Sequence, residues 1–349
     1  MDNSHEAQDS IREDAVAVPF GFLPASYGKK FSLAAVIHIF YEEISYEILA
    51  CANNLPPGTK LFISTDTQMK RERIEKVFEG YKFGSYEVRI VPNRGRDIAP
   101  KIIGFRDVYE SYEFVLHLHS KKSVHNDRLE SWRPYLYETL SGSREQVQDI
   151  LGIFERFPDI GMIFPQHYEY IRRWLTWGEN FEVAARLAAR LGYLLSPDHP
   201  LDFPSGSMFW ARSAALKPLL DLDLSYDDFP PEAGQSDNTP AHAVERMYAI
   251  VCELAGYGWM KIARPEFLAD GSSVAPIRNL AGLEDFIATN TRHLTFGPAP
   301  GPVDDFNSTQ IPVSPQLAAI AEQHRQWLAF SEKFGHWTKA PLFPWGPVR

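Results

Sequence analysis

The fold class of this chain is decided by one stretch, Leu33-Ala34-Ala35-Val36-Ile37-His38-Ile39-Phe40. This short, almost uninterrupted apolar run is typical of a β-strand that is buried on both faces. Strands of this kind belong to parallel sheets, because the connections between parallel strands cover both faces with helices. The next segment, Ile44 to Asn53, is helix-like and is closed by Pro56-Pro57-Gly58, as such a connection requires.

The same alternation continues along the first half of the chain. Further strands are predicted at residues 60–64, 86–91 and 112–118, and helix-like segments at 71–78 and 98–109. This order predicts an α/β fold with a mostly parallel sheet flanked by helices. Ligands of such sheets bind at the carboxyl ends of the strands, so polar residues directly after each strand are the first candidates for a site.

The second half is less regular. Helices are predicted at 144–157, 182–195 and 239–254, and a short strand at 160–164. We expect three parts: a flexible N-terminal arm (1–28), one α/β domain (29–275), and an irregular C-terminal extension with helical and Pro/Trp-rich pieces (276–349).

Composition narrows the class of protein. Of 349 residues, 44% are hydrophobic and 23% charged, which is typical of a globular protein. The formal net charge of -10 argues against a nonspecific nucleic-acid binder. The two cysteines, Cys51 and Cys252, form no disulfide framework and favour a reducing compartment. The chain shows no apolar run of membrane-spanning length and no secretory signal, so we expect a cytoplasmic location.

Polar residues follow the first two strands. His38 ends the first, and Asp66 follows the second. An aspartate at such a position can accept hydrogen bonds from a nucleobase or ribose. The alternative is a helix N-cap or an Asx turn.

The turn before the third helix-like segment carries two arginines. In Pro92-Asn93-Arg94-Gly95-Arg96-Asp97-Ile98-Ala99-Pro100, Arg94 and Arg96 flank Gly95. Glycine permits a close backbone approach, and guanidinium groups bind phosphate or carboxylate with two hydrogen bonds. The alternative is a solvated turn in which Asp97 caps the helix.

The fourth strand ends in His117-Leu118-His119-Ser120-Lys121-Lys122-Ser123. In a strand, His117 and His119 point to one face. The pair could ligate zinc, but further ligands at zinc spacing are not obvious, so we favour a cationic cradle with Lys121 and Lys122. The alternative is a satisfied core histidine followed by surface lysines.

Two later segments complete the set of candidates. Ser205-Gly206-Ser207-Met208-Phe209-Trp210 combines small residues with aromatics and suits a wall for a flat ligand, or a strand entering the core. Asp237 precedes a helix on which His242, Glu245 and Arg246 share neighbouring turns. A loop carboxylate beside His and Arg is a candidate general base, or simply a cap. The sequence contains no Walker A loop, G-x-G-x-x-G fingerprint or H-E-x-x-H motif.

Taken together, these segments resemble the rhamnan synthesis protein F family, which is linked to bacterial cell-surface polysaccharide assembly. The resemblance covers about residues 31–270 and is carried by four motifs: residues 93–100, 119–123, 205–210 and 237–246.

That family in turn looks like a divergent GT-A glycosyltransferase. On this resemblance Asp66 contacts the nucleotide base, Asp237 is the catalytic base of an inverting transfer, and Gly256-Tyr257 matches the usual Gly-Tyr after the helix. The sequence departs from the pattern at the metal-binding D-x-D, whose place is taken by His119-Ser120-Lys121. Lysine and histidine can neutralise a leaving diphosphate as a divalent cation does. This departure from the family pattern therefore predicts metal-independent transfer without a cofactor.

The expected reaction moves a sugar, rhamnose or a related deoxyhexose, from a nucleotide-sugar donor to a glycan or lipid-linked glycan acceptor. Expected donor-binding residues are His38, Asp66, Arg94, Arg96, Asp97, His117, His119, Lys121 and Lys122. Expected acceptor-binding residues are Ser207, Trp210, His242 and Glu245. A lipid-linked acceptor is compatible with peripheral association at the inner face of the cell membrane; nucleic acid is not an expected partner. Two alternatives stay open: a noncatalytic nucleotide- or carbohydrate-binding module, and a metal-dependent hydrolase built on His117 and His119.

Overall fold

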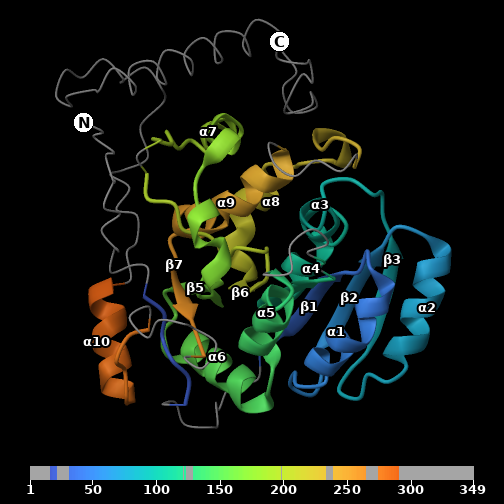
Figure 1. Ribbon diagram of the computed structural model, residues 1–349, viewed down its shortest axis with the longest axis horizontal. Coiled ribbons are helices and arrows are strands. Elements are labelled where there is room, and N and C mark those ends of the chain that lie inside the picture. Colours follow the sequence, from blue (N-terminus) through green and yellow to red (C-terminus); the bar gives the residue numbers. More distant parts are fainter. Residues whose placement is uncertain are drawn as a thin grey trace, which may run out of the picture.

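The computed structural model describes residues 16–21, 31–120, 122, 129–197, 199–232, 239–264 and 274–290. Within this part of the chain one sheet has the strand order β3-β2-β1-β4-β6-β5-β7 (Figure 1). The strands are β1 Leu33–His38, β2 Lys60–Thr65, β3 Tyr86–Ile90, β4 Phe114–His119, β5 Ile160–Pro165, β6 Phe209–Arg212 and β7 Gly258–Ile262. Only β6 runs antiparallel to its neighbours β4 and β5, so the predicted mostly parallel sheet is confirmed.

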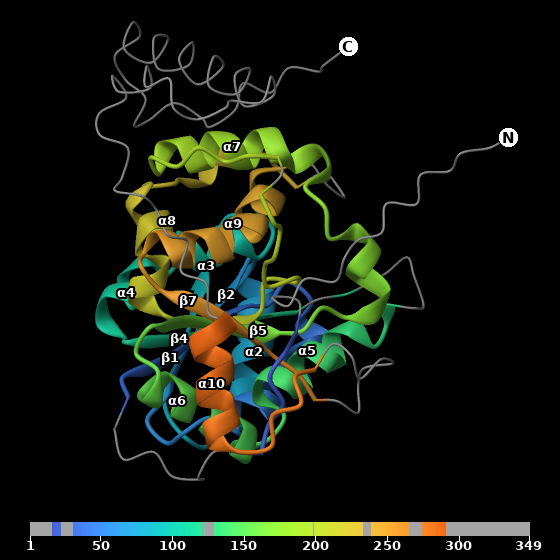
Figure 2. The same cartoon turned by 90° about the vertical axis from the view of Figure 1, so that its left-hand side faces the viewer.

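Helices cover both faces of the sheet. They are α1 Ser45–Ala52, α2 Gln68–Phe78, α3 Ile98–Ile102, α4 Arg106–Ser111, α5 Trp132–Ser141, α6 Arg144–Arg156, α7 Phe181–Arg190, α8 Lys217–Asp221, α9 Pro240–Leu254 and α10 Leu280–Asn290. Short 3-10 helices are η2 Glu42–Ile44, η4 Glu169–Trp174, η5 Gly178–Asn180, η6 Ser213–Leu216 and η7 Tyr226–Asp228. Figure 2 shows α3, α8 and α9 on one side of the sheet and α5, α6 and α10 on the other.

The two faces of the sheet bury two separate apolar cores. Along β1, Leu33, Ala35 and Ile37 enter the first core, whereas Ala34 and Val36 enter the second. Residues of α1, α2, α5, α6 and α10 complete the first core, and residues of α3, α4, α7, α8 and α9 complete the second. Because every residue of β1 is buried, its sequence is apolar throughout instead of alternating.

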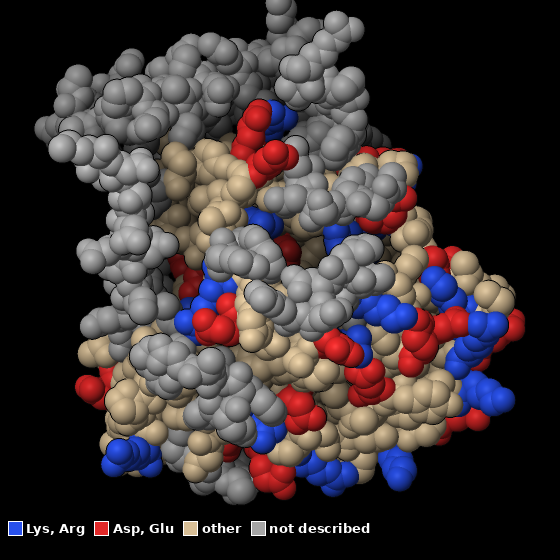
Figure 3. Space-filling view, viewed as in Figure 1, with Lys and Arg blue, Asp and Glu red and all other residues tan. Residues whose placement is uncertain are grey.

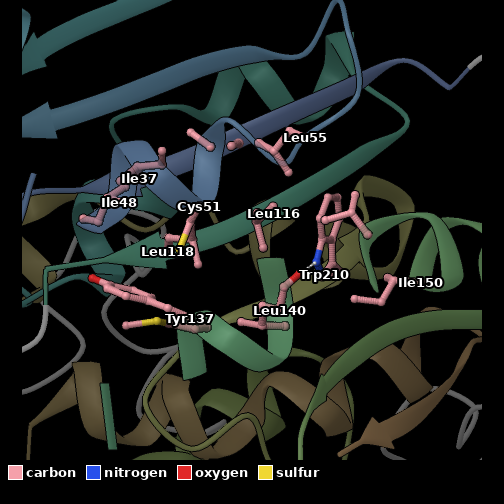
Figure 4. Packing of buried hydrophobic residues seen from close by; sticks show 14 of the residues in the cluster. Ile37, Ile48, Cys51, Leu55, Leu116, Leu118, Tyr137, Leu140, Ile150 and Trp210 are labelled. Carbon is pink, nitrogen blue, oxygen red and sulfur yellow. Dashed lines mark hydrogen bonds between the residues drawn. The ribbon is translucent and has the colours of Figure 1, made fainter. Parts of the chain in front are cut away.

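The alternation along β4 and β6 decides which candidate residues face which core. Leu116 and Leu118 enter the first core, so His117 and His119 point to the opposite face, as predicted. Trp210 of β6 is fully buried in the first core, and its indole nitrogen donates to the carbonyl of Leu140 at 3.0 Å. Figure 4 shows this hydrogen bond beside Ile150.

Several elements differ from the sequence prediction. The helix expected at 98–109 is divided into α3 and α4, with Gly104 between them. A Cβ on Gly104 would lie 2.5 Å from the carbonyl oxygen of Pro100, so the chain packs tightly at this break. The helix α5 and the strand β7 were not predicted. Of the two interpretations of Ser205 to Trp210, the strand entering the core is the one the structure shows, beginning at Phe209 as β6.

Both ends of the described chain pack onto the sheet. Within the predicted arm, Ala17 and Val18 are fully buried, and Val18 forms a parallel bridge with Ile262 of β7. Within the predicted extension, α10 places Leu283 in the first core. The sheet edge at β7 is therefore covered by chain from the N-terminal side.

Candidate functional site

The carboxyl ends of β1, β2 and β4 lie side by side. His38 is in register with both Ser64 and His119, and its Nδ1 lies 3.0 Å from the hydroxyl of Ser64. The hydroxyl of Ser120 accepts hydrogen bonds at 2.8 Å from the backbone nitrogens of Phe40 and Tyr41. Ser120 thus ties the loop after β1 to the end of β4. Burial lowers the pKa of His38 from 6.5 to about 4, so its ring is neutral near pH 7.

The turn that carries Arg94 and Arg96 depends on its glycine. Gly95 has a φ of +69°, and a Cβ there would lie 2.5 Å from Cβ of Ala99 and 2.7 Å from the ring of Phe229. Arg96 also has a positive φ, 56°. Its backbone nitrogen donates to Oε1 of Glu232 at 2.9 Å. This hydrogen bond holds the turn against the 226–232 segment.

Asp97 and Lys101 form a buried ion pair at the start of α3. Nζ of Lys101 lies 2.7 Å from Oδ2 of Asp97, and the exposed fractions of the two side chains are 0% and 13%. Burial alone would raise the pKa of Asp97, but His119 and Lys101 more than offset this and hold it well below its usual range. Asp97 is therefore an ionised carboxylate whose charge is balanced inside the protein.

Three side chains, those of His119, Glu245 and Lys101, form hydrogen bonds with the backbone of the Ser205–Ser207 segment. Nε2 of His119 donates to the carbonyl of Gly206 at 2.7 Å. The backbone nitrogen of Gly206 donates to Oε1 of Glu245 at 2.7 Å. Nζ of Lys101 donates to the carbonyl of Ser207 at 2.8 Å. Gly206 has a φ of 88°, which glycine adopts readily, whereas the φ of 53° at Ser207 is unfavourable and is offset by this polar anchoring.

Arg96 also reaches the first turn of α9. Its NH1 lies 3.0 Å from Nε2 of His242, whose Nδ1 lies 2.7 Å from the hydroxyl of Thr239. Segments of all four motifs behind the family resemblance therefore meet here. We call this set the central cluster: Arg96, Asp97, Lys101, His119, Gly206, His242 and Glu245.

The other predicted donor-binding residues lie around or away from this cluster. Asp66 forms an ion pair with Lys70 at 2.7 Å, and Lys122 forms one with Glu43. NH1 of Arg94 donates to Asp227 at 3.0 Å.

Of the remaining predicted site residues, His117 and Trp210 are fully buried, and Lys121 and Asp237 are not described by the structure. His117 is fully buried, and its Nε2 lies 2.8 Å from the hydroxyl of Tyr109. The same hydroxyl lies 3.2 Å from the carbonyl of Lys101, so His117 borders the central cluster. Trp210 is also fully buried but lies in the first core, on the other face of the sheet, so its side chain does not reach the central cluster. Lys121 and Asp237 lie outside the described residues.

Sequence reasoning missed two sets of buried polar residues. Lys101 reads as an ordinary surface lysine, and only the fold reveals its burial beside Asp97. A second set, which we call the His167 cluster, consists of His167, Asp202, Ser205 and Lys261. Its members follow β5, precede β6 and lie on β7, so no local sequence pattern connects them.

Charge is mixed at this face of the molecule. Figure 3 shows a hollow near the centre of the view, in the region of α9, with acidic atoms at its floor and basic side chains at its border. The central cluster contains two basic side chains, Arg96 and Lys101, and two acidic side chains, Asp97 and Glu245. Lys101 is paired with Asp97, and Lys122, after β4, is paired with Glu43.

The residues that the structure describes contain no group of three or more His, Cys, Asp or Glu side chains arranged to hold a metal ion. None of the helices in the described ranges combines the length and the apolar character needed to cross a bilayer.

Comparison with known proteins agrees with the motifs. The sequence profile of the rhamnan synthesis protein F family matches residues 22–257. The chain is 31% identical over 257 residues to the uncharacterized protein WxcX of Xanthomonas campestris pv. campestris, strain B100, and equally to WxcX of strain ATCC 33913. The match covers 71% of this chain but only 35% of each relative. On this match, the chain belongs to the rhamnan synthesis protein F family, which ties it to polysaccharide synthesis.

Proposed function

We propose that this protein is a glycosyltransferase of surface-polysaccharide synthesis. It moves rhamnose or a related deoxyhexose from a nucleotide-sugar donor to a glycan or lipid-linked acceptor, with inversion and without a divalent cation. One observation carries the proposal: the central cluster joins the four family motifs at the carboxyl ends of the sheet strands, where α/β proteins bind their ligands.

The donor diphosphate is the group that this site has to stabilise. Negative charge develops on it as the glycosidic bond breaks, and preorganised cations lower the free energy of that state. His119 takes the place of the first acidic metal ligand, and its Nε2–H is fixed on the carbonyl of Gly206. We assign the diphosphate to Arg96, Lys121 and Lys122, next to His119. In this arrangement side-chain cations replace the usual divalent ion.

Asp237 is the proposed catalytic base. It would take the proton of the acceptor hydroxyl as that oxygen attacks the anomeric carbon. Both ends of its segment are attached to Arg96: Glu232 accepts from the backbone nitrogen of Arg96, and Thr239 is linked to its guanidinium through His242. In the sequence, Asp237 follows Glu232 by five residues and precedes Thr239 by two. This supports a role beside the diphosphate.

A metal-dependent hydrolase built on His117 and His119 receives less support. Nε2 of His117 is engaged by Tyr109, and Nε2 of His119 by the carbonyl of Gly206. A noncatalytic binding module would use the same cluster and differs only in the absence of turnover.

Binding and turnover are tested in two steps. A panel of nucleotide sugars is first screened by thermal shift, since a ligand of the native state raises its melting temperature. The donors that bind are then incubated with candidate acceptors, and free nucleoside diphosphate is measured. Binding with release supports the transferase, and binding without release in any combination supports the module. The absence of binding by any donor contradicts the transferase and a nucleotide-binding module.

A further inference from the structure

The His167 cluster reaches the same backbone segment that the central cluster holds. Nδ1 of His167 lies 2.9 Å from the hydroxyl of Ser205, and Nε2 lies 2.8 Å from Oδ1 of Asp202. Lys261 forms an ion pair with Oδ2 of Asp202, and its side chain is 1% exposed. His167, Ser205 and Lys261 are buried, the Asp202 side chain is 16% exposed, and the proposed reaction uses none of them.

The hydrogen-bond partners determine where the protons are. Burial alone would raise the pKa of Asp202, but Lys261 and His167 outweigh it and lower the pKa below its usual value. Asp202 is therefore a carboxylate, which can only accept, so Nε2 of His167 carries a proton. Burial lowers the pKa of His167 below 6.5. The ring is consequently neutral near pH 7, and Nδ1 has a lone pair.

It follows that the hydroxyl of Ser205 donates its proton to Nδ1 of His167. A hydroxyl has one proton and two lone pairs, so the oxygen of Ser205 can then only accept from any further partner. The series of hydrogen bonds from Asp202 through His167 to Ser205 thus makes the serine oxygen an acceptor for any further partner. Gly206, which follows Ser205, is bonded at its carbonyl to His119, beside the proposed diphosphate. Ser205 therefore directly precedes the residue that His119 holds, and its hydroxyl comes from the same backbone segment as the proposed donor site.

We propose that Ser205 binds a hydroxyl group of the donor sugar, and that His167 and Asp202 are positioning residues that keep its oxygen an acceptor. This inference rests on the proposed function and adds a specificity element to it. An oxygen that can only accept favours a ligand hydroxyl over a ligand group without a proton to donate.

The test distinguishes a contact with the sugar from a contact with the nucleotide. Calorimetry gives the dissociation constant of the nucleotide sugar that binds best and of its nucleoside diphosphate alone. Ser205→Ala should weaken the nucleotide sugar about 3- to 10-fold, the effect of one hydrogen bond, and leave the diphosphate within about twofold. Ser205→Thr keeps a hydroxyl and should restore most of the loss. Ser213→Ala is the matched control, because this buried serine donates to the carbonyl of Tyr112 instead.

A second variant reverses the polarity without touching Ser205. In Asp202→Asn the amide can donate to Nε2 of His167, which moves the ring proton to Nδ1 and turns the serine hydroxyl into a donor. We expect the same selective loss for the nucleotide sugar. Because Asp202→Asn leaves Lys261 without its counterion, the melting temperature of this variant is measured first. If the variant does not fold, the comparison of Ser205→Ala with Ser205→Thr still tests the proposal.

The outcomes are distinguishable. If no nucleotide sugar binds the wild-type protein, the proposed function fails and this inference fails with it. If nucleotide sugars bind but Ser205→Ala leaves their affinity unchanged, only the inference is overturned. An equal loss for the nucleotide sugar and the diphosphate also overturns it, because that result indicates a general structural role.

Discussion

Arg96 and His242 are 146 residues apart in the sequence, yet NH1 of the arginine lies 3.0 Å from Nε2 of the histidine. A guanidinium can only donate, so Nε2 must accept and Nδ1 must carry the ring proton. Nδ1 is 2.7 Å from the hydroxyl of Thr239 at the start of α9. The arginine turn before α3 is thus coupled to the helix that follows the proposed base.

Replacing Arg96 by Ala should weaken binding of a nucleoside diphosphate by at least about tenfold, the effect of losing one charge-assisted hydrogen bond. The affinity is measured by calorimetry at fixed salt. Arg73→Ala serves as the control, since Arg73 is 58% exposed and pairs with Glu42 on the surface. Equal affinities of the two variants would remove Arg96 from the diphosphate site.

Asp237→Asn should lower turnover by about 10²-fold or more, because an amide cannot take the proton of the acceptor. Donor binding should stay within about threefold, since the variant changes a proton acceptor and not a phosphate contact. Asp221→Asn is the control, as this aspartate is exposed on α8 and pairs with Lys217. Turnover close to the wild-type value in Asp237→Asn would exclude Asp237 as the base.

Gly95→Ala should lower the free energy of unfolding by roughly 2–4 kcal/mol, from left-handed strain together with overpacking against Ala99 and Phe229. Gly192 has a similar φ of +74° but nothing within 4 Å of a Cβ. Gly192→Ala should therefore cost only the strain, about 1–2 kcal/mol. Chemical denaturation measures both. Identical losses would show that the contact with Phe229 does not matter.

His38 should make the protein less stable as the pH falls. Its pKa is 6.5 in the unfolded reference and about 4 in the folded protein, so the unfolded state binds more protons between these values. The free energy of unfolding should decrease across this window by up to about 1.4 kcal/mol per pH unit from this group. Its stabilising effect is complete above pH 6.5 and is lost as the pH falls to about 4.

The measurement compares the wild-type protein with His38→Asn from pH 7 to pH 4. The variant should show a shallower loss of stability, while His117 and His167, whose pKa values burial also lowers, titrate in both proteins. Parallel stability curves would show that His38 does not carry this effect.

The sheet could be predicted from the sequence because its strands are buried on both faces. β1, β2 and β4 therefore read as continuous apolar runs, and the polar residues that end them stand out. β7 escaped prediction because Lys261, a charged residue in a five-residue strand, is buried by pairing with Asp202. No local sequence pattern predicts such a partner, because the partner residue comes from a distant segment of the chain.

The site was predictable in its motifs but not in its contacts. Arg96, His119, Glu245 and His242 were selected from local composition, and the structure joins them. Trp210 shows the opposite case. Its position after small residues suggested a ligand wall, but the alternation along β6 turns its ring into the core. Side-chain direction within a strand depends on register, which the sequence alone did not define there.

The most direct test of the central claim is turnover without metal. The purified protein is incubated with its nucleotide-sugar donor and acceptor in excess EDTA, and released nucleoside diphosphate is followed over time. We expect the same rate with EDTA as with Mn²⁺ or Mg²⁺, because arginine, lysine and histidine neutralise the leaving group. Release that stops in EDTA and returns with Mn²⁺ would contradict it.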